Sequence, residues 1–114
     1  MRNVLVLAVL TALATGISVH AAETDGRVIE ISIEKDYGNY AFIKVDTPPA
    51  PPVACSQNGY WQYTLPLANE VDKRIFAMVM SSYLTQRAMH FRGTGGCSEF
   101  SAVESLAGAR LLRP

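Results

Sequence analysis

A histidine and an arginine are the side chains here that could carry out a reaction. His90 and Arg92 stand two residues apart, and with a carboxylate they could supply the base, acid and phosphate-binding cation that a secreted ribonuclease needs. No other histidine follows residue 20, and no spacing marks the carboxylate. A small hydrolase that uses His90 is one hypothesis, but its motif is not diagnostic.

Aromatic residues are the more informative group. Tyr and Trp at the rim of a sheet offer a flat apolar face with a polar handle, which suits stacking on sugar rings or nucleobases. The neighbouring segments carry acids, including Glu30 and Glu34, rather than interleaved Lys and Arg, so sugars are the favoured class over nucleic acids. A Trp such as Trp61 is more often a core residue, and this alternative stays open. The candidate ligand contacts are Tyr37, Tyr40, Tyr60, Trp61, Tyr63, His90 and Arg92.

The first 21 residues have the pattern of a secretory signal peptide. Arg2 supplies the positive start, residues 4–14 are an apolar run, and the compact residues Val19 and Ala21 favour cleavage after Ala21. The run is shorter than the ~20 residues that span a bilayer, so stable membrane insertion is not expected. The mature chain would be residues 22–114, one secreted or periplasmic domain with residues 22–26 as a flexible lead-in.

Export determines how the two cysteines are interpreted. An oxidising compartment favours a disulfide between Cys55 and Cys97 over free thiols or metal ligands. A zinc site would have to recruit His90 without any CxxC or HxxxH spacing. The glycine-rich residues 93–96 lack the Lys-Ser/Thr pair of a phosphate-binding loop, so they predict a turn. We therefore expect no metal and no cofactor.

Composition narrows the class of protein further. The 114 residues include 10 Lys and Arg against 10 Asp and Glu, and 49% are hydrophobic. The hydrophobic fraction excludes a disordered chain, and the balanced charge offers no broad basic field for nucleic acid. A single small globular domain is what remains.

Alternating apolar residues predict three strands before a helix. Residues 27–35 place Ile29, Ile31 and Ile33 on one face, residues 40–46 resume β-branched and aromatic character, and residues 60–65 form a third strand. The second and third strands are separated by a loop with four prolines. Turn residues at 36–39 make the first two strands a hairpin.

A helix is predicted after the third strand. Asn69 is its expected N-cap, and it should run to about Thr85. The stripe that packs on the sheet contains Val71, Ile75, Met78, Val79 and Ser82. Beside that stripe lies a second apolar group, interpreted either as core or as an interface with a partner: Phe76, Met80 and Tyr83.

Two strands complete the predicted domain. Residues 86–92 alternate with Met89 and Phe91 inward, and residues 103–112 hold a final strand. The order is β-β-β-α-β-β, mainly β with one helix. That order is the topology of the five-stranded OB-fold barrel.

Three sequence segments carry a resemblance to a known family: GRVIEISI at residues 26–33, PVACS at 52–56 and GTGGC at 93–97. With the helix between them, they resemble small secreted OB-fold proteins related to the B subunits of bacterial AB toxins, such as subtilase cytotoxin and typhoid toxin. The resemblance covers about residues 27–112 and implies an OB barrel, a ring of five subunits with helices toward the centre, and glycan recognition on the outer sheet surface. It assigns no sugar-contacting residue to a particular position.

The sequence thus predicts an exported, non-enzymatic binding module that recognises a carbohydrate or a protein surface. Two alternatives stay open. One is an envelope protein-interaction or inhibitor domain that uses the helix face around Phe76, Met80 and Tyr83. The other is the small hydrolase that uses His90.

Overall fold

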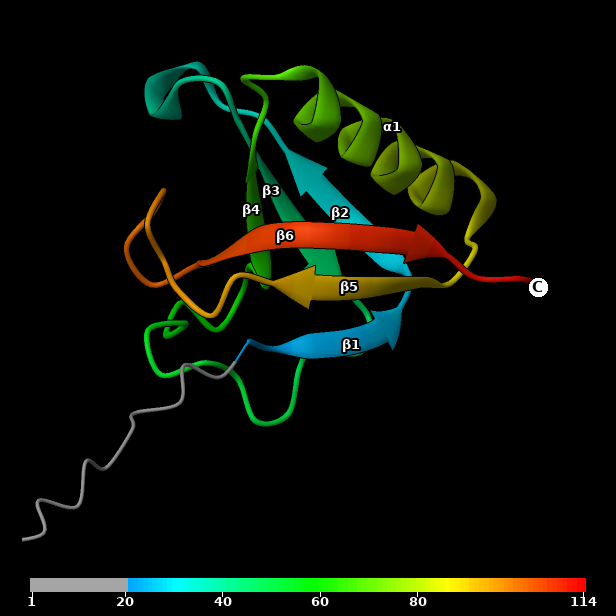
Figure 1. The fold of residues 1–114 in the computed structure, drawn as a ribbon, viewed down its shortest axis with the longest axis horizontal. Helices are drawn as coiled ribbons and strands as arrows, with labels where there is room; N and C mark the ends of the chain where they lie inside the picture. The colour runs from blue at the N-terminus through cyan, green and yellow to red at the C-terminus, as the bar shows by residue number, and fades with distance from the viewer. Residues whose placement is uncertain (1–20) are drawn as a thin grey trace, which may run out of the picture.

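One curled sheet with one α-helix makes up the part of the chain that the computed structural model describes, residues 21–114 (Figure 1). The predicted leader therefore lies outside the described residues, apart from Ala21. The elements are β1 (Glu23–Gly26), β2 (Val28–Ser32), a 3₁₀ turn η1 (Lys35–Tyr37), β3 (Tyr40–Val45), β4 (Tyr63–Pro66), α1 (Glu70–Thr85), β5 (Met89–Gly93) and β6 (Glu104–Leu111).

The strand order explains how the sheet curls. It is β1-β5-β6-β4-β3-β2, with every neighbouring pair antiparallel except β4 and β6, which are parallel. β1 and β2 are separated in the chain by Arg27 alone, yet they lie at opposite ends of this order. The sheet therefore bends round into a half-barrel. The fold is mainly β with one helix, as predicted, but it has six strands rather than five.

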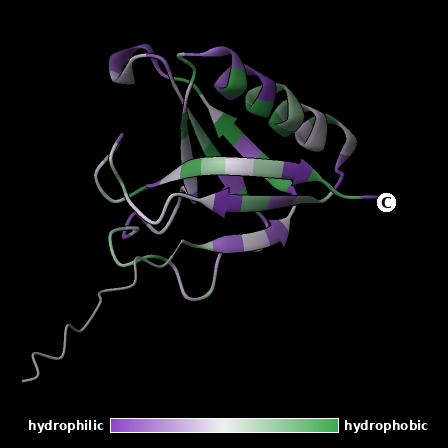
Figure 2. Cartoon of the chain, viewed as in Figure 1, coloured by the Kyte–Doolittle hydropathy of each residue, from purple (hydrophilic) through white to green (hydrophobic). Residues whose placement is uncertain are grey.

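The additional strand is β1, where the sequence predicted a flexible lead-in. Glu23 pairs with Arg92 and Asp25 pairs with His90 across the antiparallel β1–β5 ladder, and complementary polar side chains in such positions stabilise the pairing. Figure 2 shows β1 as largely hydrophilic. The prediction was wrong because this segment becomes a strand by pairing with polar residues of β5 about 65 residues away, not through its own hydrophobic pattern.

The predicted inward face of the first long strand is also corrected. Val28 is the buried residue of β2 and Ile31 packs on the core as predicted, while Ile29 and Ile33 are 49% and 50% exposed. The β2–β3 register shifts between Val28 and Glu30. A bulge of this kind inserts one residue and turns the following side chains to the other face, which strict alternation cannot anticipate.

The helix begins as predicted. The side chain of Asn69 accepts a hydrogen bond from the backbone N–H of Asp72, and Val79 and Ser82 are buried against the sheet. Val71 is 64% exposed, contrary to the predicted stripe, because the core contacts of α1 begin one turn later, at Ile75. Within residues 21–114, no helix has the length and apolar character needed to cross a membrane.

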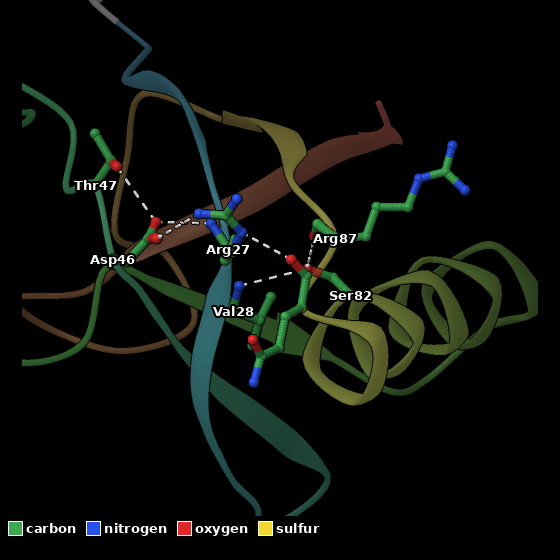
Figure 3. Close-up of polar contacts among 7 residues, drawn as sticks. Arg27, Val28, Asp46, Thr47, Ser82 and Arg87 are labelled. Carbon is green, nitrogen blue, oxygen red and sulfur yellow. Dashed lines mark hydrogen bonds and ion pairs between the residues drawn. The ribbon is translucent and has the colours of Figure 1, made fainter. Parts of the chain in front are cut away.

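Polar contacts fasten the end of α1 to the bend between β1 and β2 (Figure 3). The Arg27 guanidinium donates from Nε to the Gln86 carbonyl at 2.7 Å, and the Arg27 backbone N–H donates to Asp46 at 2.7 Å. The Ser82 hydroxyl donates to the Arg87 carbonyl at 2.6 Å. The contacts to Gln86 and Arg87 satisfy carbonyls at the end of the helix. The backbone N–H of Val28 donates to the Ser82 hydroxyl at 3.4 Å, which fixes the helix against β2.

The core lies between α1 and the concave side of the sheet. Met89 and Phe91 on β5 are fully buried, as predicted, and so are Tyr63 and Leu65 on β4. The rings of Tyr63 and Phe91 stack with their centroids 5.7 Å apart. β4 starts at Tyr63 rather than residue 60, so Trp61 precedes the strand.

Candidate aromatic binding cleft

A disulfide joins the two loops that form the candidate site. Cys55 in the β3–β4 loop is bonded to Cys97 in the β5–β6 loop, with Cα atoms 6.1 Å apart, which confirms the predicted bridge. The backbone N–H of Asn58 also donates to the carbonyl of Ala102 at 3.0 Å. Two segments about 40 residues apart in the chain are thereby held side by side.

Phe100, just beyond the disulfide, is the centre of an aromatic cluster. Its ring centroid lies 4.8 Å from that of Phe42, 4.9 Å from Tyr40 and 5.7 Å from Tyr37, each contact close to edge-on. Edge-to-face contacts at these distances are favourable. The β5–β6 loop thus supplies one ring that packs on rings from β3 and η1.

Trp61 extends this cluster from the opposite loop. The Asn58 side-chain oxygen accepts hydrogen bonds from the backbone N–H groups of Tyr60 and Trp61, at 3.1 and 2.9 Å. This turn places the Trp61 ring 5.9 Å from Phe42 and 5.0 Å from Tyr60. Trp61 is only partly buried, so its ring belongs to the surface cluster rather than to the core below α1.

The cluster borders an open cleft of about 500 Å³. Its apolar walls come from four of the rings and from Val103, and its polar groups come from η1, the turn before Trp61 and the β5–β6 loop. The cleft is lined by Ser32, Glu34, Asp36, Tyr37, Phe42, Asn58, Trp61, Phe100, Ser101 and Val103. Aromatic faces beside a few hydroxyl, amide and carboxylate groups are what a small polar ligand requires.

The charges of the cleft limit what it can bind. Glu34 and Asp36 are its ionisable carboxylates, and no Lys, Arg or His belongs to its lining in the described part of the chain. An anionic ligand would meet like charge without a compensating cation. The cleft therefore suits neutral or cationic ligands better than anionic ones.

Tyr60 lies beside the cleft and is tied to other charged groups. Its hydroxyl donates to Glu30, and this hydrogen bond raises the pKa of Tyr60 from its usual value. The Lys44 ammonium lies 3.7 Å from the centroid of the Tyr60 ring. One face of this ring is thus already occupied by a cation, and of the two neighbouring rings only that of Trp61 lines the cleft.

Glu99 supports the loop that carries Phe100. Its carboxylate accepts hydrogen bonds from the hydroxyls of Ser105 and Ser98. These two bonds, that from Ser105 foremost, hold the pKa of Glu99 below its usual value. The ionised carboxylate thereby braces the β5–β6 loop against the start of β6.

The remaining predicted ligand residues lie elsewhere. Tyr63 is fully buried in the core, whereas His90 and Arg92 line a separate hollow of about 300 Å³ with Glu23 and Arg110. The Nδ1 atom of His90 is 2.6 Å from Asp25, and Nε2 is 3.6 Å from Glu23. Both ring nitrogens thus face carboxylates of β1. Among residues 21–114, no group of three or more His, Cys, Asp or Glu side chains is arranged to hold a metal ion.

The helix residues considered for an interface divide between core and surface. Phe76 is partly buried and packs on the core, Met80 is partly buried, and Tyr83 is 45% exposed. Tyr83 borders a hollow with the exposed residues Ile29 and Leu84. The exposed apolar surface is therefore at the C-terminal end of α1 and next to β2.

Of the rings that line the cleft, Phe42 and Phe100 were missed from the sequence. A usable signal existed for Phe42, because it follows Tyr40 at the i+2 spacing that places two side chains on one face of a strand. Phe100 lies in an irregular loop with no periodicity. Its position beside Trp61 follows only when the disulfide is combined with the parallel pairing of β4 and β6.

No protein-family model, curated protein or solved structure matches this chain. The cleft's function must therefore be argued from its own geometry.

Proposed function

We propose that this chain is an exported, non-enzymatic binding module of the OB-fold type. Support comes from the topology: a parallel pair, β4 and β6, sits within an otherwise antiparallel order whose two ends, β1 and β2, are consecutive in the chain. In an OB-fold, β1 and β2 would be two halves of one bent strand that closes the barrel. Kinship to the AB-toxin B subunits belongs to the same proposal.

The position of the cleft supports a binding role. OB-folds bind ligands on one face of the sheet and with the loops that flank it. Here the cleft is lined by Phe42 from β3, Tyr37 from η1 and Phe100 from the β5–β6 loop. The disulfide holds the loops in place without a ligand, which lowers the entropic cost of binding.

The ligand we propose is a neutral carbohydrate, bound by stacking on Trp61 and Tyr37. The observation that carries this proposal is the combination of partly exposed aromatic rings with the carboxylates Glu34 and Asp36 in one cleft. Carboxylates accept hydrogen bonds from sugar hydroxyls, and the rings stack on the apolar faces of the sugar. Acidic sugars would be disfavoured by the same carboxylates.

A glycan array that contains neutral and acidic glycans tests this proposal. The mature protein and its His90→Ala variant, both checked for folding by circular dichroism, should bind the same neutral glycans. His90 is outside the cleft lining, so its loss should leave binding largely intact; a hydrolytic activity of the wild type that His90→Ala abolished would favour the hydrolase hypothesis. A folded protein that bound no glycan would remove the carbohydrate proposal.

A second candidate function is self-association, with a second copy of this chain as the partner. The exposed residues Ile29, Tyr83 and Leu84 surround one hollow at the end of α1, and apolar groups in such a patch favour contact with another protein. A ring of five subunits, implied by the family resemblance, is one form of this proposal.

Light scattering of the wild type and of Leu84→Glu tests self-association. The wild type should be larger than a monomer, and Leu84→Glu should be smaller because it places a charge in the contact. Lys73→Glu, on an exposed part of the same helix, is the matched control. A wild type that stayed monomeric at all concentrations would leave a different protein as the partner.

Export of the chain completes the proposal, with cleavage after Ala21 and a secreted or periplasmic location. The Cys55–Cys97 disulfide supports this location, since structural disulfides persist in oxidising compartments.

A further inference from the structure

The first buried residue of the described chain is Ala22, which is 1% exposed. Its carbonyl accepts hydrogen bonds from the Tyr63 hydroxyl at 3.2 Å and from the Gly93 N–H at 2.9 Å. Its own N–H donates to Oε2 of Glu104 at 3.2 Å. Residue 22 is thus held by three strands, β4, β5 and β6, instead of leading loosely into the domain.

Glu104 occupies a site built for its carboxylate. The side chain is 1% exposed, and Oε2 also accepts a hydrogen bond from the Gly95 N–H at 2.9 Å. A Cβ atom at Gly93 would lie 2.0 Å from Oε2, so only glycine leaves room for the carboxylate there. A buried carboxylate in a fitted site is costly unless charge or hydrogen bonds compensate it.

Cleavage after Ala21, proposed above, would change the chemistry of this contact. Hydrolysis of the Ala21–Ala22 bond adds one water, leaving a carboxylate on Ala21 and an amine on Ala22. That amine takes up a proton below its usual pKa of about 8. The nitrogen that now donates to Glu104 as an amide would then carry a positive charge.

We propose that the new amino terminus at Ala22 binds Glu104 as a buried ion pair, so that removal of the leader completes the fold of this domain. The pair joins the start of β1 to β6 and to the loop stabilised by the disulfide. A charge-assisted hydrogen bond is roughly twice as strong as a neutral one. The processed chain is therefore more stable than the same chain with any residue before Ala22.

The first measurement is the intact mass of the protein exported with its own leader, which should correspond to a chain that starts at Ala22. A start at any other residue would overturn the proposal, because the α-amine would not be the atom that faces Glu104. This result is independent of glycan binding, since neither Ala22 nor Glu104 lines the aromatic cleft.

The second measurement is a double-mutant cycle on thermal stability. Residues 22–114 are released from a carrier protein under oxidising conditions, either with Ala22 first or with one additional glycine before it, and each form is made with Glu104 and with Glu104→Gln. The glycine should lower the melting temperature of the Glu104 protein by about 5–10 °C. It should have less than half that effect in the Gln variant.

Glu23→Gln is the matched control, because Glu23 is the adjacent carboxylate but is exposed. It should leave the effect of the added glycine unchanged. Equal effects of the glycine in the Glu104 and Gln backgrounds would overturn the proposal and assign Glu104 a purely structural role.

A pH series keeps the proposal testable if Glu104→Gln does not fold. In the Glu104 protein, the stability difference between the two termini should shrink as the pH rises from 7 to 10, because the α-amine loses its charge. Burial raises the pKa of Tyr63, the nearby hydroxyl, above its usual range, so Tyr63 stays protonated in this series. A difference that did not change with pH would contradict the proposal.

Discussion

The helix-covered core and the aromatic cleft use the same kinds of residue in different ways. In the core, Tyr63 on β4 and Phe91 on β5 are fully buried, and their rings stack although β6 lies between the two strands in the sheet order. In the cleft, Tyr37 is 54% exposed and meets Phe100 edge-on. The two core rings are covered on both sides, whereas the cleft rings Tyr37 and Trp61, which lie outside the strands, keep part of their surface exposed. Aromatic residues thus fill the core in one region and line an open cleft in the other.

The largest expected loss of stability comes from a substitution in the core alone, which distinguishes the core from the cleft. Phe91→Ala removes a fully buried ring and should lower the free energy of unfolding by about 3–5 kcal/mol. Urea denaturation measures this loss. Tyr37→Ala, on the exposed side of the cleft, is the control and should cost under about 1 kcal/mol. Equal losses would mean that the two regions form one cooperative core.

Loss of the disulfide should affect both regions. The double variant Cys55→Ser with Cys97→Ser opens a bridge that spans 42 residues, which corresponds to about 4 kcal/mol on the chain-entropy model. Thermal melts of the variant and of the wild type, with and without reductant, measure the loss. Reductant should not change the variant further. An unchanged melting temperature would show that hydrogen bonds such as Asn58 to Ala102 hold the loops by themselves.

Trp61→Ala should break the cleft while leaving the core intact. The affinity for the neutral glycans found on the array should fall about tenfold, because stacking and burial of one ring contribute on the order of 1–2 kcal/mol. Isothermal titration calorimetry measures this affinity. Phe91→Leu, a milder core change, is the control: it should lower stability yet retain binding. Unchanged affinity in Trp61→Ala would place the sugar elsewhere.

The sequence predicted the regions that depend on short-range pattern and failed where distant segments decide the structure. The helix cap at Asn69, the inward positions of Met89 and Phe91, and the disulfide were all predicted, since each has a local or compositional signal. β1 was not predicted, because it forms by pairing with β5, which lies far along the chain. The bulge after Val28 was not predicted either, because a register shift cannot be recognised from the alternation of apolar and polar residues.

The candidate site was predictable only in part for the same reason. Tyr37, Tyr40, Tyr60 and Trp61 do gather in one cluster, as their neighbourhood in the sequence suggested. Phe100, the centre of that cluster, comes from a loop whose place depends on three-dimensional pairing. A residue's type predicts what it can contact, but the topology determines which residues it meets.

The smallest expected effect concerns the loop that carries Phe100. Hydrogen bonds from Ser105 and Ser98 lower the pKa of Glu99, so its stabilising contribution is present above the unfolded pKa of 4.5 and is lost as the pH falls through the folded value. Glu99→Gln should therefore cost under about 1 kcal/mol at pH 7. Urea denaturation from pH 7 to pH 3 should show this cost shrinking with acidification. Ser105→Ala, which removes the principal donor, should follow the same trend, and a cost that stayed constant down to pH 3 would mean that Glu99 acts through packing alone.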